Sequence, residues 1–584
     1  MSTRGTICTN KFLIGFFVHF SVLSGGILNI FLRDVIIMLT TIKETSQMNV
    51  KASFCSSLEK IFTYSDIDFS FGGISLLSGE KGNFQLVLKS RKNTDIRVSC
   101  SCPYAALYEV KEIYSGYAID KENCGDTLLV GGGEPGYYPD LLDSFDGKIT
   151  LEAGKTRAIW INIDTKDAVP GEYNFTVTLS ENEESRKLET KVKILKTGLP
   201  AQKLIHINWF HTDCLASYYK KEVFSEDHWT IVENFIKNAV NHGVNCIFTP
   251  LFTPPLDTEV GGERPTVQLV GVRRRRNYVY EFDFSLLDRW VDMCLKAGAE
   301  YFELSHLFTQ WGAKHAPKIM AETSSGYKRI FGWETSATSD AYKNFLKQFG
   351  SALKEYTDKK GITDICFVHC SDEPGLDDIK DYKKASDLIR KYFGAYEHID
   401  ALSDYDFFKK GLIGTPVPEE GSIDEFSGKV EKLWTYYCCG QYRDNLPNRF
   451  FSMPSIKTRI LGVLLYKYNC TGFLQWGFNF YYSQHSKREL DPFKETDAGG
   501  AFPSGDSFVV YPGKDGMPLS SLRQKVFYDG FQDISALRAL EEKYSREYVL
   551  DFIKETLGDI DFRNYPLDAE VFLGFREKLC EKLA

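Results

Sequence analysis

Short β-rich runs of alternating apolar and polar residues dominate the chain from residue 48 to about residue 198. NFQLVLKS, TRAIWINIDT and YNFTVTLS are examples, and turn clusters such as SGEKG and SENEES separate them. Strands at this spacing, without a helical period, are typical of an antiparallel sandwich. We expect TRAIWINIDTKDAVPGEYNFTVTL to form a hairpin of an immunoglobulin-like module, with Gly-Glu-Tyr at its turn. The pattern therefore predicts an all-β, antiparallel β-sandwich domain over residues 48–198.

From residue 203 the pattern changes to strand, loop and helix. HWTIVENFIKNAVNHG and FSLLDRWVDMCLKAGA place apolar residues at helical spacing and reach a glycine near their ends. Eight strand candidates alternate with such helices, which predicts an α/β domain, a (β/α)8 barrel of the TIM type, over residues 199–530. The C-terminal helices of residues 531–584 are expected to pack on the barrel. The strand candidates are KLIHINWF (203–210), VNCIFTPLF (244–252), YFELSHLF (301–308), DICFVHC (364–370), HIDALSD (398–404), KLWTYY (432–437), TGFLQWG (471–477) and SFVVYP (507–512).

The first 47 residues form an apolar leader. Residues 12–32 carry no Asp, Glu, Lys or Arg, and a run of this length can span a bilayer or serve as a signal peptide. His19 and Asn29 interrupt the run, and no clean cleavage site follows it. The sequence that begins at Met48 is typical of a folded domain from its first residues. We therefore favour an over-extended start with translation from near Met48 and a cytoplasmic protein; a membrane anchor or secretion through residues 12–32 is the alternative.

Composition narrows the range of partners and cofactors. The formal net charge of -9 argues against nucleic acid as a partner. The fourteen cysteines include no Cys-x-x-Cys pair and no Cys/His cluster with zinc spacing, so we expect no metal and no other cofactor. Such cysteine usage indicates reduced thiols. The run Arg273 to Arg276 is expected at the exposed tip of a hairpin.

The strand candidate ICFVHC runs directly into Asp372, Glu373 and Pro374. Two adjacent carboxylates repel each other and cost desolvation energy in an enclosed site, and proline ends the strand. A capped turn is one reading, in which Asp377 or Asp378 caps the next helix and the two acids favour only its dipole. The other reading is catalytic, because barrel enzymes carry their chemistry at the carboxyl ends of the strands.

Carboxylates and aromatic rings at strand ends suggest glycoside hydrolysis. Neighbouring strand residues point to opposite faces, so Asp372 and Glu373 cannot easily flank one glycosidic bond. A contiguous pair instead suits substrate-assisted catalysis, in which the 2-acetamido oxygen of the sugar attacks the anomeric carbon. Glu373 would protonate the leaving oxygen and then activate water, while Asp372 would orient the acetamido group. Further candidates at the strand ends are His211, Asp213, His306, Trp311, Trp434, Tyr436, Tyr437 and Trp476.

The chain resembles glycoside hydrolase family 123, the β-N-acetylgalactosaminidases, over roughly residues 50–584. The stretches INWFHTDCLASYY, HCSDEP and GFLQWGFNFYYS carry the resemblance. It implies exo-cleavage of terminal β-linked N-acetylgalactosamine (GalNAc) from a glycan, with retention, and it places Asp372 and Glu373 on the catalytic pair. By analogy with other substrate-assisted hexosaminidases, Tyr436 or Tyr437 would hold the acetamido carbonyl.

The remaining candidates would form the walls of the sugar site. Trp434 and Trp476 are expected to stack on the sugar, and His211, Asp213 and His306 to bind its hydroxyl groups. The same His211, Asp213 and His306 can be read as metal ligands, but no two of them share a ligand spacing on one element. Two other functions stay open: a glycosidase of other hexosamine or hexose specificity, with Asp404 or Asp213 as second carboxylate, and a non-catalytic carbohydrate-binding barrel.

Overall fold

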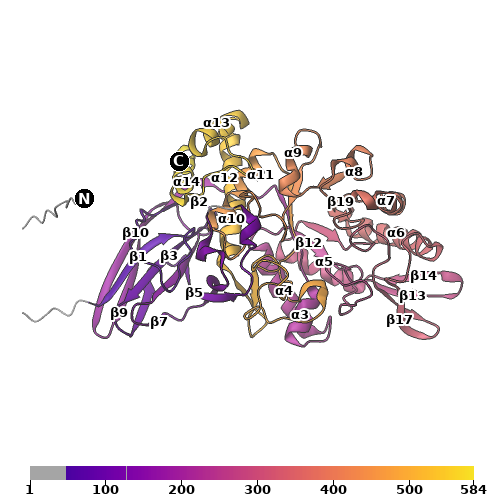
Figure 1. Ribbon diagram of the computed structural model, residues 1–584, viewed down its shortest axis with the longest axis horizontal. Helices are drawn as coiled ribbons and strands as arrows, with labels where there is room; N and C mark the ends of the chain where they lie inside the picture. The colour runs from indigo at the N-terminus through magenta and orange to yellow at the C-terminus, as the bar shows by residue number, and fades with distance from the viewer. Residues whose placement is uncertain (1–47, 126–127) are drawn as a thin grey trace, which may run out of the picture. The chain divides into compact units, whose positions relative to one another are not determined.

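The computed structural model describes residues 48–125 and 128–584 (Figure 1). The expected leader of residues 1–47 lies outside these residues, and so does the choice between anchor, signal and over-extended start. Within the described ranges, no helix has the length and apolar character that a membrane crossing requires.

The N-terminal region contains two five-stranded sheets. Their strands pair antiparallel, with one exception: β2 runs parallel to β10. The ring of Phe175 in the second sheet meets Phe54 and Phe84 of the first edge to face, at centroid distances of 6.2 and 5.1 Å, so the two sheets share apolar contacts. The first sheet has the order β1 (Val50–Ser56), β3 (Lys81–Ser90), β8 (Thr156–Asp164), β5 (Ala105–Ser115) and β6 (Gly136–Ser144), and the second β2 (Ile74–Ser78), β10 (Glu184–Gly198), β9 (Gly171–Glu181), β4 (Thr94–Cys100) and β7 (Lys148–Leu151).

The hairpin predicted for the TRAIWINIDT and YNFTVTLS runs is wrong. β8 lies in the first sheet between β3 and β5, whereas β9 lies in the second sheet and forms its hairpin with β10. Gly171 of the predicted turn begins β9 itself. The connection changes sheets at Thr165, whose hydroxyl donates to the carbonyls of Leu77 and Glu80. Alternation predicted both strands correctly, but it contains no information on which strand is the partner.

Eight parallel strands form the central sheet. Its end strands β20 and β21 approach each other through a bridge between Glu419 and Tyr436, with the Tyr436 amide 3.0 Å from the Pro418 carbonyl oxygen. The sheet is therefore a nearly closed barrel. Its order is β20 (Thr415–Val417), β19 (Glu397–Ala401), β18 (Cys366–Val368), β15 (Tyr301–Leu304), β12 (Cys246–Thr249), β11 (Ile205–Asn208), β22 (Gly472–Gln475) and β21 (Trp434–Tyr436).

Seven of the eight predicted strands belong to this barrel, and the eighth is wrong. SFVVYP gives β23 (Val510–Pro512), which pairs antiparallel with β24 (Pro518–Ser520) outside the barrel. The missing barrel strand is β20, a run of only three residues that contains Pro416. Proline lacks the amide that a central strand donates, so the sequence pattern speaks against a strand there.

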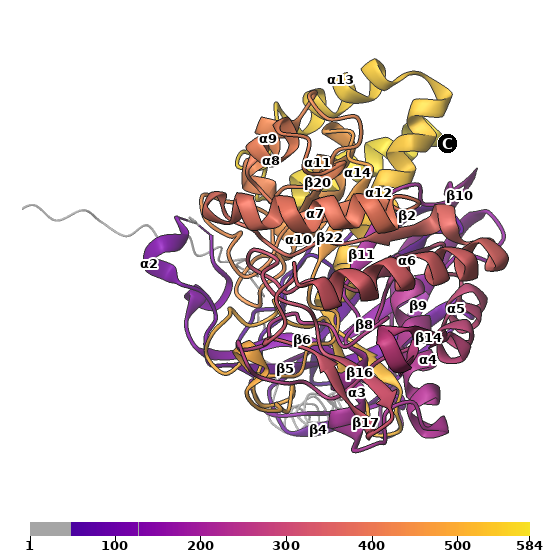
Figure 2. The same cartoon turned by 90° about the vertical axis from the view of Figure 1, so that its right-hand side faces the viewer.

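The predicted helices are confirmed. Figure 2 shows α6 and α7 side by side on the outside of the barrel. The tip of the β13–β14 hairpin carries the arginine run as predicted, and Arg275 pairs there with Glu281 at 2.9 Å. The helices are α4 (Glu226–Val240), α5 (Ser285–Ala297), α6 (Asp340–Lys360), α7 (Ile379–Phe393), α10 (Ser455–Arg459), α11 (Leu461–Lys467), α12 (Leu522–Lys543), α13 (Arg546–Leu557) and α14 (Ala569–Leu583), and the hairpin strands are β13 (Gly271–Arg274) and β14 (Tyr280–Asp283).

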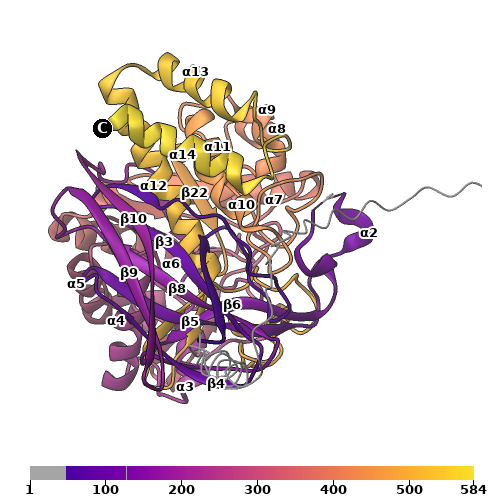
Figure 3. The ribbon, with the colours of Figure 1, turned by 90° about the vertical axis from the view of Figure 1, so that its left-hand side faces the viewer.

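Helix α12 runs without interruption across residue 530, the predicted end of the barrel domain. Arg576 of α14 pairs with Asp533 of α12 at 2.8 Å and with Glu80 of the N-terminal region at 2.5 Å. These contacts join α14 to α12 and to the N-terminal region, and Figure 3 shows α14 beside α12. Because all three side chains are buried, breaking the set would leave charges unpaired in the interior.

Candidate active site

A cavity of about 240 Å³ opens where the carboxyl ends of the barrel strands meet. All of these strands except β20 contribute to its wall, directly or through the segment that follows them. Aromatic rings, carboxylates and thiols therefore line one cavity. They belong to Trp209, Asp257, Trp311, Asp372, Glu373, Tyr436, Cys438, Cys439, Trp476, His485 and Phe502.

The carboxylate pair stands on a constrained piece of backbone. Glu373 has a φ of 44°, a left-handed conformation that a residue with a side chain rarely adopts. Two hydrogen bonds hold it there: the Glu373 amide donates to the Ala401 carbonyl at 3.0 Å, and the Trp311 amide donates to the Asp372 carbonyl at 2.9 Å. Strain of this kind persists where the surroundings over-determine the backbone, and it gathers at functional sites.

The surroundings raise the pKa of both carboxyl groups. Burial raises the pKa of Asp372 well above its usual range, and the Glu373 carboxylate adds to the rise. Burial also raises the pKa of Glu373, although the Tyr436 hydroxyl opposes this by donating to Glu373 Oε1 at 2.7 Å. Burial and the adjacent Glu373 raise the pKa of Tyr436, so its phenol stays a donor. Asp372 is half-buried and Glu373 is exposed to the cavity.

A buried ion cluster lies behind the pair. His369 Nε2 is 2.5 Å from Glu303 Oε1, and His369 Nδ1 is 3.2 Å from Asp400 Oδ1. Burial opposes protonation, but the two carboxylates prevail and raise the pKa of His369 to about 10. Trp209 donates its indole N–H to Glu303 at 2.8 Å, which ties a cavity wall to the same cluster. His369 is therefore an imidazolium at neutral pH, and its charge favours the ionised form of Asp372.

Asp400 fixes the chain between strand β18 and the carboxylate pair. Its Oδ1 accepts from the amides of Cys370 at 2.9 Å and Ser371 at 3.2 Å, and its Oδ2 accepts from the Tyr382 hydroxyl at 2.5 Å. His398 Nε2 lies 3.0 Å from Oδ2. These bonds come from α7, β19 and the strand end itself, so Asp400 positions the residues that lead to Asp372.

We predict that His369 makes folding stability depend on pH. Its pKa of about 10 in the folded protein exceeds the value of about 6.5 expected when unfolded. The stabilisation is therefore complete below pH about 6.5 and is lost as pH rises toward about 10, with a size on the order of a few kcal/mol. Urea unfolding across this range should show the free energy of unfolding falling more steeply in wild type than in His369→Gln. The half-buried His315, replaced by Gln, is the control, and equal slopes in wild type and His369→Gln would contradict the prediction.

A second buried ion pair supports the wall beside Trp476. Arg264 donates from Nε and Nη2 to the two oxygens of Asp213, each at 2.7 Å. His211 accepts from Arg264 at Nδ1, 3.2 Å away, and donates from Nε2 to the Trp476 carbonyl at 2.8 Å. Burial lowers the pKa of His211 to about 3, so the ring is neutral and can accept a hydrogen bond at Nδ1 while it donates one at Nε2.

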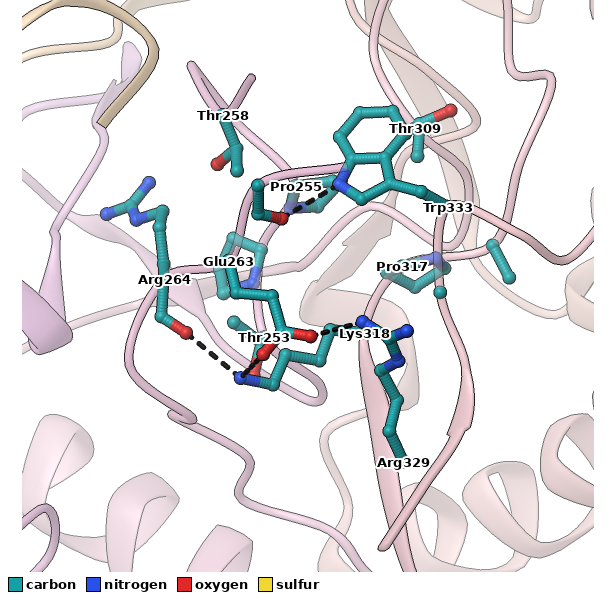
Figure 4. A pocket seen from close by; sticks show the side chains of 14 residues that line it. Thr253, Pro255, Thr258, Glu263, Arg264, Thr309, Pro317, Lys318, Arg329 and Trp333 are labelled. Carbon is teal, nitrogen blue, oxygen red and sulfur yellow. Dashed lines mark hydrogen bonds and ion pairs between the residues drawn. The ribbon is translucent and has the colours of Figure 1, made fainter. Parts of the chain in front are cut away.

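The main chain around Arg264 is fixed from the other side. Lys318 donates to the Arg264 carbonyl at 3.1 Å and pairs with Glu263 at 2.8 Å, and the Trp333 indole donates to the Gly262 carbonyl at 3.1 Å. In Figure 4 the guanidinium of Arg264 leads away from Lys318, Arg329 and Trp333. Arg264 therefore connects Lys318, which binds its carbonyl group, to Asp213 and His211 behind the cavity wall.

The family model described as "Glycoside hydrolase 123, catalytic domain" matches residues 209–540, more than half of the chain. The chain belongs to glycoside hydrolase family 123. The resemblance seen in the HCSDEP and GFLQWGFNFYYS motifs is thereby confirmed.

Solved structures agree with this assignment at the level of the fold. A family 123 glycoside hydrolase from Clostridium perfringens, solved in a study of glycolipid glycan hydrolysis, is 16% identical; the match covers 92% of this chain and 98% of that one, with a TM-score of 0.71. Two other solved structures are much less similar: β-glucuronidase 3 of Bacteroides uniformis (11% identity, 82% of this chain and 51% of that one covered, TM-score 0.29) and a termite-gut GH10 xylanase with a bacterial Ig-like domain (11% identity, 80% and 100% covered, TM-score 0.33). No curated protein matches the chain.

Half of the predicted site residues of this family 123 protein line the cavity. Asp372, Glu373, Trp311, Tyr436 and Trp476 are brought together there. The other five are His211, Asp213, His306, Trp434 and Tyr437, and the cavity lining does not include them.

The strand pattern explains two of these five. Trp434 shares a face of β21 with Tyr436 but lies one layer deeper, where Gly472 leaves room for it; a Cβ on Gly472 would come within 2.1 Å of the Trp434 ring. Tyr437 points to the opposite face and packs on Phe473 and Phe527. Both side chains are buried.

His211, His306 and Asp213 are buried behind the residues that line the cavity. His306 is buried against the rings of His369 and Trp209, at centroid distances of 4.3 and 5.4 Å. His211 and Asp213 hold Arg264 as described above. His211, Asp213 and His306 do not form a metal site, because both carboxylate oxygens of Asp213 already accept hydrogen bonds from Arg264.

The sequence pattern did not predict several residues of the cavity. Asp257 follows β12 in a run of strand-end residues, and its Oδ2 accepts from the His485 amide at 3.0 Å. His485 and Phe502 come from the long segment after β22, where no periodic pattern marks them. Cys438 and Cys439 belong to no motif with a ligand spacing. The position of Asp257 two residues beyond a proline-rich strand end was the one usable signal.

Among the described residues, Cys370, His398 and Asp400 form the group whose ligand atoms lie close enough to hold a metal ion, within 4.8 Å of one another. Both Asp400 oxygens already accept the hydrogen bonds described above, and those partners come from three different elements. The group therefore works as a hydrogen-bonded brace of the strand end.

Proposed function

We propose that this protein is an exo-acting, retaining glycosidase that releases terminal β-linked GalNAc from glycans by substrate-assisted catalysis. The observation that carries the proposal is the contiguous Asp372–Glu373 pair, which lines the cavity and whose Glu373 accepts a hydrogen bond from Tyr436. The finer fold assignment belongs to the same proposal: a TIM-type barrel preceded by a β-sandwich. The near closure between β20 and β21 and the rings shared between the N-terminal sheets support it.

The two carboxyl groups would take different roles. Glu373, whose pKa is raised, gives its proton to the leaving oxygen while the acetamido oxygen of the substrate attacks the anomeric carbon. Asp372 accepts the acetamido N–H and stabilises the positive charge of the oxazoline-like intermediate. Glu373, now ionised, takes a proton from water, which attacks the same carbon from the face that the leaving group vacated. Two inversions give net retention.

The remaining cavity residues suit a terminal sugar. The rings of Trp209, Trp311 and Trp476 offer apolar faces to the C–H groups of a pyranose. Tyr436 donates to the acid and lies next to the pair, which makes it the candidate for the acetamido carbonyl once the substrate is bound. Asp257 is the candidate for the sugar hydroxyl groups.

A substrate panel tests the proposal. We predict hydrolysis of aryl β-GalNAc, weaker hydrolysis of aryl β-GlcNAc and none of aryl β-galactoside, because only the first two carry an acetamido nucleophile. Proton NMR of the first product should show the β-anomer. Equal cleavage of the galactoside would refute substrate assistance, and an α-anomer as first product would refute retention.

A glycosidase with two catalytic carboxylates is the competing function, and Asp257 is the residue that favours it. The second carboxylates expected for such an enzyme are engaged elsewhere, Asp213 with Arg264 and Asp404 as N-cap of a short helix, where it accepts from the Asp406 amide at 2.9 Å. Asp257 lines the cavity together with Glu373.

Asp257→Asn separates the two functions. If Asp257 only binds a hydroxyl group, we expect KM for aryl β-GalNAc to rise by about tenfold or more, with kcat little changed, because a hydrogen bond to a charged group contributes about 1.5–3 kcal/mol. If Asp257 is a second catalytic carboxylate, kcat itself should fall by orders of magnitude. Glu259→Gln, an exposed acid two residues further on, is the control.

A further inference from the structure

Two adjacent thiols stand in the cavity wall. Cys438 and Cys439 follow β21 directly, both are half-buried, and both line the same cavity as the carboxylate pair. Cys438 Sγ lies 3.9 Å from Glu373 Oε1, so the pair reaches the proposed catalytic acid.

Side-chain hydrogen bonds fix the backbone that presents these thiols. The Cys438 amide donates to Gln441 Oε1 at 2.8 Å, and Asn448 donates to the Cys438 carbonyl at 2.9 Å and to the Gln441 carbonyl at 2.5 Å. Gln441 in turn donates to Glu419. The thiols therefore sit in a fixed position, which lowers the entropy cost of binding one ligand with both.

Their setting distinguishes them from the other cysteines of the described ranges. Apart from this pair, only Cys100 and Cys102 are half-buried there, and the remaining cysteines are buried. Cys100 ends strand β4 in the N-terminal region, away from the barrel. Within residues 48–125 and 128–584, a reagent that enters from solvent thus meets two pairs of thiols, and one of them lies in the substrate cavity.

We propose that Cys438 and Cys439 form a dithiol site that binds thiophilic ligands, specifically trivalent arsenicals, inside the substrate cavity. Thiolate sulfur is a soft ligand and favours soft centres. A phenylarsenic(III) oxide reacts with two thiols: two S–H bonds break, two As–S bonds form, and the oxygen leaves as water, with no change of oxidation state. The bound group then lies beside Glu373 and occupies the space of the sugar.

The protonation state of the Cys438 thiol determines which thiol reagents react with it. The hydrogen bond with Cys439 and then burial raise the pKa of Cys438 well above its usual range. Alkylating agents need the thiolate, so iodoacetamide should label Cys438 slowly at neutral pH. The arsenical carries the protons away as water and does not share this requirement.

The test uses the full chain with Cys100→Ser and Cys102→Ser as background, since neither residue lies in the cavity and activity should equal that of wild type. After phenylarsine oxide, we expect one phenylarsenic group per chain, mapped to Cys438 and Cys439 by mass spectrometry, and loss of nearly all hydrolysis. Dimercaptopropanol should restore activity, whereas mercaptoethanol should not, because only a dithiol competes with a two-sulfur site.

Single variants complete the test. Cys438→Ser and Cys439→Ser, each compared with its own untreated rate, should lose the retained arsenic and resist inactivation; Cys439→Ala serves if a serine variant fails to fold. Absence of arsenic on the pair in the background protein would overturn the proposal, as would full labelling with unchanged activity. The mapping by mass spectrometry does not depend on the proposed substrate. A failure of the GalNAc assignment would therefore leave the labelling result intact and affect only the measurement of hydrolysis.

Discussion

Glu373→Gln is expected to abolish hydrolysis of glycans in which GalNAc is linked to another sugar. A sugar alkoxide leaves poorly without a proton, and proton transfer by a positioned acid contributes about 10²–10⁴-fold in rate. An aryl glycoside with an acidic phenol as leaving group needs less help, so its first step should suffer less. Glutamine keeps the size of the side chain and an oxygen that can accept from Tyr436, so the loss reports the proton and not the fold.

The measurement is kcat/KM of the variant on a GalNAc-terminated disaccharide and on an activated aryl β-GalNAc. Glu431→Gln, an exposed acid ahead of β21, is the matched control and should match wild type on both substrates. Equal losses on the two substrates would show that Glu373 is not the general acid. Full activity on the disaccharide would remove it from the mechanism altogether.

Asp372→Asn should impair every substrate, however good its leaving group. The acetamido group must be oriented and its developing charge stabilised each time it attacks, so an activated aryl glycoside gains nothing. Removal of one group that stabilises transition-state charge typically costs about 10²–10³-fold in kcat. Burial and Glu373 raise the pKa of Asp372, and the buried His369 imidazolium behind the pair opposes this rise.

A stable analogue of the oxazoline, GalNAc-thiazoline, gives a second readout. It should inhibit wild type as a competitive ligand and bind Asp372→Asn far more weakly, because the variant lacks the carboxylate that meets the ring nitrogen. Asp377→Asn, at an exposed acid just ahead of α7, is the control. Retained activity of Asp372→Asn on aryl β-GalNAc would contradict the role assigned here, and so would failure of the thiazoline to inhibit wild type.

Local pattern determined a large part of this protein. Helical periodicity located α4 to α7 and the C-terminal helices, because an amphipathic helix repeats its apolar face within a few residues. Strand alternation found seven barrel strands, and the carboxylates after ICFVHC stood out because such charges rarely follow a buried strand. The motifs around them determined membership in family 123.

The partner of each strand, and the depth of each side chain within the barrel, depended on the tertiary structure. β8 and β9 alternate alike yet belong to different sheets, and β20 enters the barrel despite its proline. Trp434 and Tyr436 share one face of a strand, but only Tyr436 reaches the cavity. Periodicity specifies which face a residue occupies, not which strand lies beside it nor how far along the barrel it sits.

Charge partners were likewise invisible in the sequence. Asp213 meets Arg264, and His369 meets both Glu303 and Asp400, across separations of 31 to 66 positions along the chain. Only folding brings such groups within hydrogen-bonding distance. Once they are buried, each charge needs an opposite charge nearby, because an unpaired charge in the interior costs desolvation energy. The sequence by itself thus determined the catalytic candidates, the helices and the family, whereas the tertiary structure decided that His211 and Asp213 brace the wall while Asp257, Cys438 and Cys439 face the cavity.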